Sequence, residues 1–405
     1  MSIAKSHNDN KCTSCQLCAA VCPTDAIKIG LDRWGFYRPK VVTDKCVDCG
    51  LCEQVCYRFQ EVDHTNNVDT YQNYGASAKD DSIVSETTSG GIADLMCETL
   101  IVQDYKCVGV VYDKDTDTAI GALAETREQT LPFRGSKYIQ SYSFPVFKKI
   151  LKQYKNDRVA VFGTPCQIFG LDLYLNRIHK RDNFLLIDLY CHGCPTMNLW
   201  KKYINEVKLK TGVESFDKVT FRSKVKGWGN FYVSAEKDNR LCFVSPKAND
   251  PFFAMFFSDS VLNEACSDCT IRGTVAHCDI RLGDFWGKKY DLNTRGVSLV
   301  TIVSDKGAMV FSDIADKIDF KQHTAADFLP YQSWGKSYKV NAPLRESLLN
   351  SLADETVPLS ETIKLYNKSL SVKQIIKRVL KTIALQLPTS FISFAKNIYH
   401  RTIKT

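Results

Sequence analysis

The amino-acid sequence predicts an α+β and α/β multidomain protein, in which a small cysteine-rich module precedes an α/β body with a mixed sheet. Two cysteine runs occupy much of the first 56 residues. From Thr88 onward, short apolar runs of the buried-strand type alternate with stretches of helical periodicity. Past about residue 215, strand-like runs follow one another with few long helices between them. The cysteines therefore mark the module, and the other two patterns predict the body.

The N-terminal module is defined by two runs with the same spacing, C-x2-C-x2-C-x3-C. The first run contains Cys12, Cys15, Cys18 and Cys22, and the second contains Cys46, Cys49, Cys52 and Cys56. This is the spacing of a bacterial ferredoxin with two 4Fe–4S clusters, in which the fourth cysteine of each run binds the other cluster. We therefore expect one cluster on Cys12, Cys15, Cys18 and Cys56, and the other on Cys46, Cys49, Cys52 and Cys22. A zinc site or disulfides are the alternatives, but zinc gives no reason for two fourfold runs.

The remaining elements follow from local patterns along the chain. Residues 57–85 are polar and without a clear period, which predicts a linker. Helical periodicity predicts helices over 92–102, 144–154 and about 166–175. Apolar and β-rich runs predict strands over 107–112, 159–162, 184–190, 218–221, 230–235 and 297–303.

Further cysteines lie where two of these predicted strands end. Cys166 follows the strand at 159–162, Cys191 ends the run at 184–190, and Cys266 and Cys269 form a C-x2-C pair in a loop. Sites gather outside the carboxyl ends of such strands, so the four thiolates are expected to meet and to hold a third 4Fe–4S cluster. Cys97, Cys107 and Cys242 are interpreted instead as small core hydrophobes without partners. Cys194 and Cys278 are near enough to replace a ligand, and the sequence leaves that alternative open.

The positive charge of the chain is concentrated at its C-terminal end. The formal net charge is +8, from 53 basic and 45 acidic residues. Nine of the basic residues and none of the acidic ones lie after Glu361, so the rest of the chain is nearly neutral. This distribution argues against a general nucleic-acid-binding surface. It indicates that the positive charge at the C-terminal end has a local role in binding.

The same end also has an apolar stripe at helical spacing. Its members are Val372, Ile375, Ile376, Val379, Leu380, Ile383 and Leu387. Lys373, Lys377 and Lys381 lie away from the centre of the stripe. A basic amphipathic helix of this kind can lie on an anionic membrane, so residues 362–405 are expected to contact such a surface or an acidic protein. The alternative is that the stripe packs on the body of the protein.

The compartment is predicted from what the chain lacks. Residues 1–11 are polar, and no window approaches 18 apolar residues. Thiolate-bound clusters also favour a reducing environment. We expect a cytoplasmic protein that is peripheral at the inner membrane surface through its tail.

Six ordered motifs of the body resemble one known family. They are TSGG at 88–91, RGSKYIQS at 134–141, GTPCQ at 163–167, DLYCHG at 188–193, C-x2-C at 266–269 and DIRLGDFWG at 279–287. Together they are similar to the coenzyme F-420 hydrogenase/dehydrogenase beta subunit family over about residues 85–340. The resemblance implies a flavin, typically FAD, beside a 4Fe–4S cluster held by the body cysteines. Cys278 departs from the small residue expected there.

The resemblance divides the chain into five parts. They are a ferredoxin domain at 1–60, a linker at 61–85, an N-terminal flavin and cluster domain at 86–195, a C-terminal family domain at 196–340 and a basic amphipathic helical tail at 341–405.

The implied flavin has candidate contacts within the same motifs. Ser89, Gly90 and Gly91 open a predicted helix, where backbone N–H groups can bind a phosphate. Lys137 offers a charge and Tyr138 a stacking ring, while Gly163, Thr164 and Gln167 lie at the expected sheet edge, with Asp284 as a further contact. His192 is the candidate for proton transfer. Each of these residues has a structural alternative, such as a turn glycine or a core aromatic.

We therefore expect an iron–sulfur flavoprotein oxidoreductase. A donor such as reduced ferredoxin would pass electrons through the clusters to the flavin and on to a small organic acceptor. Some single-chain bacterial members of the family are associated with surface-polysaccharide synthesis, which is one candidate context. The alternative is an electron-relay subunit of a larger hydrogenase or dehydrogenase complex, with no catalytic activity of its own.

Overall fold

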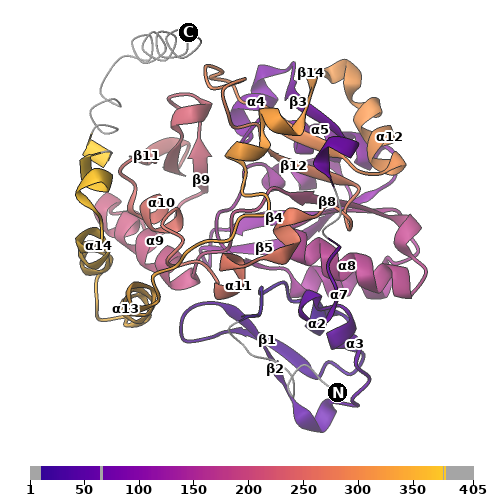
Figure 1. Ribbon diagram of the computed structural model, residues 1–405, viewed down its shortest axis with the longest axis horizontal. Coiled ribbons are helices and arrows are strands. Elements are labelled where there is room, and N and C mark those ends of the chain that lie inside the picture. The colour runs from indigo at the N-terminus through magenta and orange to yellow at the C-terminus, as the bar shows by residue number, and fades with distance from the viewer. Residues whose placement is uncertain (1–10, 64–66, 377, 380–405) are drawn as a thin grey trace.

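A computed structural model describes residues 11–63, 67–376, 378 and 379. Among these residues the strands form a large sheet of nine strands, a three-stranded sheet and a two-stranded sheet (Figure 1). No described helix is both long and apolar enough to span a bilayer. The small N-terminal module and the large mixed sheet agree with the predicted fold class.

The large sheet has the order β14-β3-β13-β12-β8-β7-β4-β5-β6. Its strands are β3 (Gln72–Ala78), β4 (Lys106–Asp113), β5 (Thr118–Ala124), β6 (Ser141–Tyr142), β7 (Val159–Phe162), β8 (Phe184–Leu189), β12 (Ile280–Asp284), β13 (Ser298–Ile302) and β14 (Ile318–His323). The central strands β12, β8, β7 and β4 are mutually parallel. β3, β13 and β14 pair antiparallel on one side, and β5 pairs antiparallel with β4 on the other. The ends of β7, β8 and β12 therefore meet at one edge.

Helices cover both faces of this sheet. One face packs against α5 (Ile92–Val102) and α12 (Asp305–Asp313), and the other against α7 (Phe144–Gln153) and α8 (Pro165–Arg177). In β8, Leu185 and Ile187 enter the first core, whereas Phe184 and Leu186 enter the second. Because side chains alternate across a strand and both faces are covered, β8 reads as a continuous apolar run.

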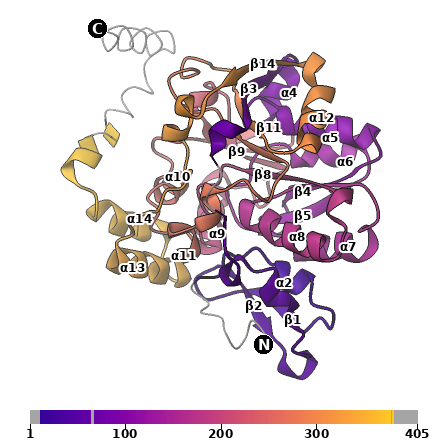
Figure 2. The same cartoon turned by 45° about the vertical axis from the view of Figure 1, so that its right-hand side comes forward.

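The N-terminal module lies at the end of the body formed by α7 and α8 (Figure 2). It contains α2 (Leu17–Ala20), the hairpin of β1 (Ile27–Leu31) and β2 (Tyr37–Val41), and α3 (Leu51–Gln54). α2 contacts both α7 and α8. At the hairpin turn, the N–H of Met197 donates to the carbonyl of Gly35 over 2.9 Å. The module is therefore joined to the body through two separate surfaces.

A second layer is built on the three-stranded sheet of β9 (Lys218–Ser223), β10 (Tyr232–Lys237) and β11 (Arg240–Pro246). α9 (Met197–Thr211) packs against this sheet, and α10 (Pro251–Phe256), α13 (Ala342–Ala353) and α14 (Leu359–Lys368) contact α9 (Figure 1). Their shared core is rich in aromatic rings, and Trp200 and Phe252 are fully buried in it. α13 and α14 contribute Leu348 and Leu359 to this core, so part of the predicted tail at 341–405 belongs to the packed body.

Most predicted elements are present, and two expectations are corrected. The segment predicted as a linker contains β3, paired on both sides, and α4 (Asp81–Glu86). Small residues fill this strand because its neighbours are close: a Cβ at Gly75 would lie 2.7 Å from the Tyr290 hydroxyl. The strand therefore lacks an apolar signature. The domain boundary expected between residues 195 and 196 also does not divide the large sheet. Strands on both sides of it, β7 and β8 before and β12, β13 and β14 after, belong to that one sheet.

Candidate functional site

The two cysteine runs of the module fold into two cavities. The lining of one includes Cys12, Cys15, Cys18 and Cys56. The lining of the other includes Cys22, Cys46, Cys49 and Cys52. Each cavity thus combines three cysteines of one run with the fourth of the other, which is the crossed arrangement expected from the spacing. We name them the inner and outer cavities, respectively.

Left-handed backbone makes the two cysteine loops tight. Ser14 and Gln16 in the first loop have φ of 65° and 71°, and the equivalent Asp48 and Gly50 have φ of 49° and 73°. Gln16 occupies a conformation that favours glycine, but its side chain has fixed partners on the body. Its amide donates to the carbonyl of Ser141 at 2.8 Å and accepts from the N–H groups of Ser143 and Phe144.

The body cysteines come together from three elements. Cys166 is the second residue of α8, Cys191 follows β8, and Cys266 and Cys269 lie in and just after α11 (Glu264–Ser267). Burial raises the pKa of Cys191, and the thiols of Cys266, Cys166 and Cys269 raise it further. Burial raises the pKa of Cys266 to about 11, with Cys269 as the next contributor. The four predicted ligands are therefore electrostatic neighbours.

The position of Cys194 leaves open which cysteine would be the fourth ligand of the body cluster. Burial raises its pKa, and Cys266, Cys191 and Cys166 contribute, so it belongs to the same neighbourhood. Cys278 does not: its thiol contacts the carbonyl of Val275 at 3.4 Å and lies in the core near the carboxylate of Asp188.

The three core cysteines have different surroundings. Cys97 and Cys107 are buried in one hydrophobic core, as expected of small core hydrophobes, and their thiols contact each other there. Cys242 is half-buried, and its thiol contacts the carbonyl of Arg240.

Within the described residues, no group of three or more His, Cys, Asp or Glu side chains is close enough to hold a single metal ion. A 4Fe–4S cube is larger than one ion, so its thiolates surround a volume instead of converging on a point. The cysteine cavities have that form.

Several predicted flavin contacts meet at the carboxyl edge of the large sheet. The Ser89 hydroxyl donates to the carbonyl of Val297, and the N–H of Gly90 donates to the hydroxyl of Ser298. A Cβ at Gly90 would lie 2.2 Å from the carbonyl of Ala76, and Gly91 has φ of 82° at the start of α5. The glycine pair therefore has a packing role that is independent of any ligand.

The contacts expected at 163–167 are organised around the start of α8. Thr164 and Gln167 form a capping box, and the Thr164 hydroxyl lies 3.2 Å from the Cys166 sulfur. The N–H of Gly163 donates to the carbonyl of Ile187. These residues position Cys166 at the sheet edge.

Two cationic side chains, which were not predicted from the sequence, bond to the other candidate flavin contacts. Arg222 of β9 bonds to Asp284 and, at 3.2 Å, to the Tyr138 hydroxyl. The Lys224 ammonium donates to the carbonyls of Ser89 and Val84, and burial lowers its pKa to about 7. No local motif marks either residue, since Arg222 and Asp284 are 62 positions apart.

The guanidinium of Arg222 is buried without a full set of partners. Its side chain is 2% exposed, and Nε and one terminal nitrogen have no hydrogen-bond acceptor. Phe231 and Trp286 flank it, with the guanidinium carbon 4.4 and 5.0 Å from the ring centroids. Trp286 in turn stacks on Trp228, whose indole N–H donates to Asp284 at 2.8 Å.

Lys137 has hydrogen-bond partners outside this group. Its ammonium donates to the carbonyls of Pro132, Phe133 and Arg134, and burial lowers its pKa to about 7. The structure thus brings Ser89, Tyr138 and Asp284 together through Arg222 and Lys224, whereas Lys137 has its own backbone partners.

His192 lies between the body cysteines and the second layer. Its Nε2 is 2.8 Å from the Asp259 carboxylate, and its Nδ1 is 3.0 Å from the Tyr338 hydroxyl. The ring is 25% exposed. Both nitrogens therefore have protein partners, and proton transfer by His192 stays a prediction.

Comparison with known proteins was made on both sequence and structure. Residues 156–327 match the family described as the C terminus of the beta subunit of coenzyme F420 hydrogenase/dehydrogenase. Residues 7–58 match the 4Fe-4S dicluster domain. A search of curated proteins finds no match. Among solved structures, a chain of the xenon-derivatised F420-reducing [NiFe] hydrogenase complex from Methanosarcina barkeri is 18% identical, with a TM-score of 0.46, covering 78% of this chain and 97% of that chain.

Proposed function

We propose that the chain is an iron–sulfur flavoprotein oxidoreductase, because residues 156–327 match the coenzyme F420 hydrogenase/dehydrogenase beta subunit family and residues 7–58 match the 4Fe-4S dicluster domain. The observation that carries the proposal is the gathering of Cys166, Cys191, Cys266 and Cys269 beside the dicluster domain. A third 4Fe–4S cluster on these residues would continue the path of electrons into the body.

A flavin fits the sheet edge on chemical grounds. Arg222 has two buried donors without acceptors, and Lys224 lies close by, which suits the diphosphate of FAD. Trp286 and Tyr138 supply aromatic surface at the same place. A bound flavin would exchange single electrons with a cluster and pairs of electrons with a small organic acceptor. The protein's part is to hold the flavin's anionic end with Arg222 and to position Cys166 by the capping box of α8.

The electron-relay subunit is a second candidate, and one observation favours it. The matching family is named for a beta subunit, and beta subunits act within complexes. A protein that oxidises a donor and reduces a small molecule by itself is an enzyme. One that does so only with a second polypeptide is a relay.

The first prediction concerns cofactor content. Protein prepared without oxygen is expected to contain about twelve irons per chain, for three clusters, together with one flavin. Iron analysis and the absorbance of the released flavin measure both. About eight irons with flavin would contradict the body cluster, and iron without flavin would contradict the enzyme in favour of the relay.

The second prediction concerns a lipid surface, which would suit a lipid-linked acceptor in surface-polysaccharide synthesis. Val372, Ile375, Ile376 and Val379 are 45–72% exposed, so the described part of the apolar stripe does not pack on the body. Leu380, Ile383 and Leu387 lie outside the described residues. With each Lys or Arg adding about 1 kcal/mol, full-length protein is expected to co-sediment with anionic liposomes.

The matched control for the liposome test is a chain ending at Leu370. That version keeps α14, which packs on the body through Leu359. It is expected to stay in the supernatant, and neutral liposomes should retain little of either version. Equal sedimentation of both versions with anionic liposomes would contradict the membrane interpretation.

A further inference from the structure

An arginine lies beside the body cysteines. Arg272 follows Cys269 by three positions in the chain. One terminal nitrogen of its guanidinium donates to the carbonyl of Cys266 at 2.6 Å, and to the carbonyl of His192, next to Cys191, at 2.9 Å. Arg272 therefore joins the two segments that contain three of the proposed cluster ligands.

The guanidinium of Arg272 is buried among uncharged acceptors. Arg272 is 4% exposed. In the described part of the chain it donates to three carbonyls, those of Cys266, His192 and Lys336. The ring of Tyr338 lies over it, with 4.3 Å between the ring centroid and the guanidinium carbon. Its Nε has no acceptor among the described residues, and a charged donor that is buried in this way is costly to the fold.

Two aspartates in the neighbouring segments have other partners. Asp259 lies 2.8 Å from the Nε2 of His192, and Asp268 accepts from the Ser337 hydroxyl at 3.0 Å. Asp268 is also exposed, so water and salt screen its charge. Within the residues that the structure describes, the chain therefore places no carboxylate against the buried charge of Arg272.

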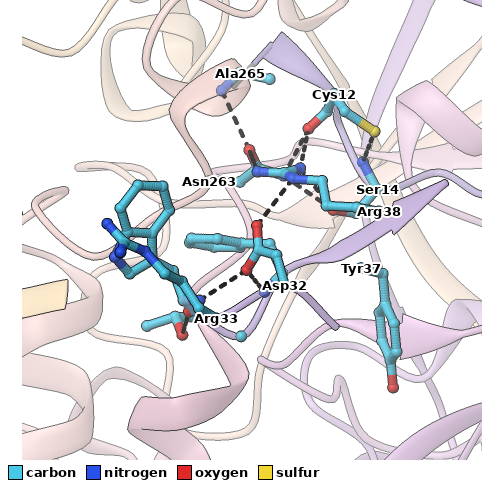
Figure 3. A network of polar contacts seen from close by, with 12 residues as sticks. Cys12, Ser14, Asp32, Arg33, Tyr37, Arg38, Asn263 and Ala265 are labelled. Carbon is cyan, nitrogen blue, oxygen red and sulfur yellow. Dashed lines mark hydrogen bonds and ion pairs between the residues drawn. The ribbon is translucent and has the colours of Figure 1, made fainter. Parts of the chain in front are cut away.

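An arginine beside the inner cavity has a similar contact but a different environment. Arg38 donates to the carbonyl of Cys12 at 2.7 Å, as Arg272 does to that of Cys266 (Figure 3). The Nε of Arg38, however, bonds to the carboxylate of Asp32 at 3.1 Å. The charge beside the inner cavity is thus compensated by the protein, whereas the charge beside the body cysteines is not.

Thiolates on the body cysteines would supply the missing negative charge. A 4Fe–4S cluster on four thiolates is an anion, and reduction by one electron makes it more negative. Burial raises the pKa of Cys191 and of Cys266, and the charge of Arg272 opposes that rise at both. The field of Arg272 therefore reaches these two sulfurs.

We propose that Arg272 is the counter-charge of the body cluster and raises its reduction potential, where the ligands of that cluster are Cys166, Cys191, Cys266 and Cys269. This rests on the proposed function and deepens it. A positive charge stabilises the reduced cluster more than the less negative oxidised one, and net charge and hydrogen bonds to the sulfurs both set the potential of such a cluster. One electron lost by a cluster of the dicluster domain is gained by the body cluster, so a higher potential there favours this direction.

The test compares Arg272→Gln with Arg272→Lys in full-length, cluster-loaded protein. Glutamine removes the charge and keeps an amide donor, whereas lysine keeps the charge and loses the planar fork. Redox titration, followed by electron paramagnetic resonance, measures the potential of the cluster whose signal is missing from the Cys166→Ser variant. At a fixed solution potential, Arg272→Gln should lower the ratio of reduced to oxidised body cluster roughly tenfold, a shift of about 59 mV. Arg272→Lys should leave the ratio close to the original, because the charge remains.

The matched control is Arg127→Gln. Arg127 pairs with Asp94 and Glu98, and Asp94 keeps Arg134 as a second partner, so the potential of the body cluster should not change. The signals of the dicluster domain show in each variant that the protein is folded. Loss of the body cluster in Arg272→Gln alone would also support the counter-charge, since lysine has the poorer hydrogen-bonding geometry and differs in keeping the charge.

Other outcomes would overturn the proposal. A purely structural arginine predicts that glutamine and lysine both lose the body cluster, or that both leave its potential unchanged. A shift of equal size in the Arg127→Gln variant would likewise show that the effect is not local. If the original protein binds only the two clusters of the dicluster domain, the body cluster of the proposed function fails together with the role of Arg272. If it binds a third cluster whose potential is the same in Arg272→Gln, only the role of Arg272 fails.

Discussion

Replacement of Cys166 by serine is expected to remove one 4Fe–4S cluster and to leave two. Iron should fall from about twelve to about eight per chain, and the electron paramagnetic resonance signal of one reduced cluster should disappear. Cys166 lies in the first turn of α8 and is held at the sheet edge by the Thr164–Gln167 capping box, so the serine variant is expected to keep its local structure. Electrons supplied to the dicluster domain would then stop short of the flavin.

The matched control is Cys97→Ser. Cys97 is 4% exposed and lies in a different core beside Cys107, so the Cys97→Ser variant should contain as much iron as the original protein. Cys194→Ser tests the ligand that the structure leaves open. Twelve irons in the Cys166 variant, or loss of a cluster in a Cys278→Ser variant, would show that the proposed ligand set is wrong.

Local spacing was sufficient to predict the dicluster domain. The crossing of Cys22 and Cys56 between the two sites follows from a motif of eleven positions, and the cavities have those lining residues. The strands β7 and β8 were equally predictable, because strands buried on both faces read as short apolar runs. The positions of these two strands also predicted that Cys166 and Cys191 lie at the same edge of the sheet.

Contacts that depend on tertiary structure were not predictable. β3 was missed because its residues from Gly75 to Ala78 are small, so a central strand reads as a polar linker. Arg222 and Lys224 were missed because arginine and lysine are ordinarily exposed. Here Arg222 at the end of β9 is buried against Asp284, and Lys224, just after β9, is half-buried against the carbonyl of Ser89. The hydrogen bond from Asn263 to the carbonyl of Cys12 was likewise not predictable, because the two residues are 251 positions apart.

Asp188→Asn is expected to lower the free energy of unfolding by about 3–5 kcal/mol. Asp188 of β8 and Arg281 of β12 form a two-point ion pair, with N–O distances of 2.7 and 2.5 Å, and their side chains are 3% and 2% exposed. The asparagine leaves the guanidinium without its counter-charge inside the sheet. Burial lowers the pKa of Arg281, and Asp188 more than offsets that effect by raising it. Without Asp188 the buried guanidinium still stays ionised, because arginine is not deprotonated in proteins, and its charge is then uncompensated.

Urea unfolding, monitored by circular dichroism, measures the free energy of unfolding of the Asp188→Asn variant. Glu86→Gln is the control. Glu86 pairs with Lys218 at 2.9 Å, but both side chains are about half exposed, so water screens the pair and its loss should cost less than about 1 kcal/mol. The double variant Asp188→Leu, Arg281→Met removes both charges and should recover much of the lost stability, since well-packed apolar residues can replace a buried ion pair. If Asp188→Asn cost no more than Glu86→Gln, or if the double variant were less stable than the single one, the cost would not come from an unpaired buried charge.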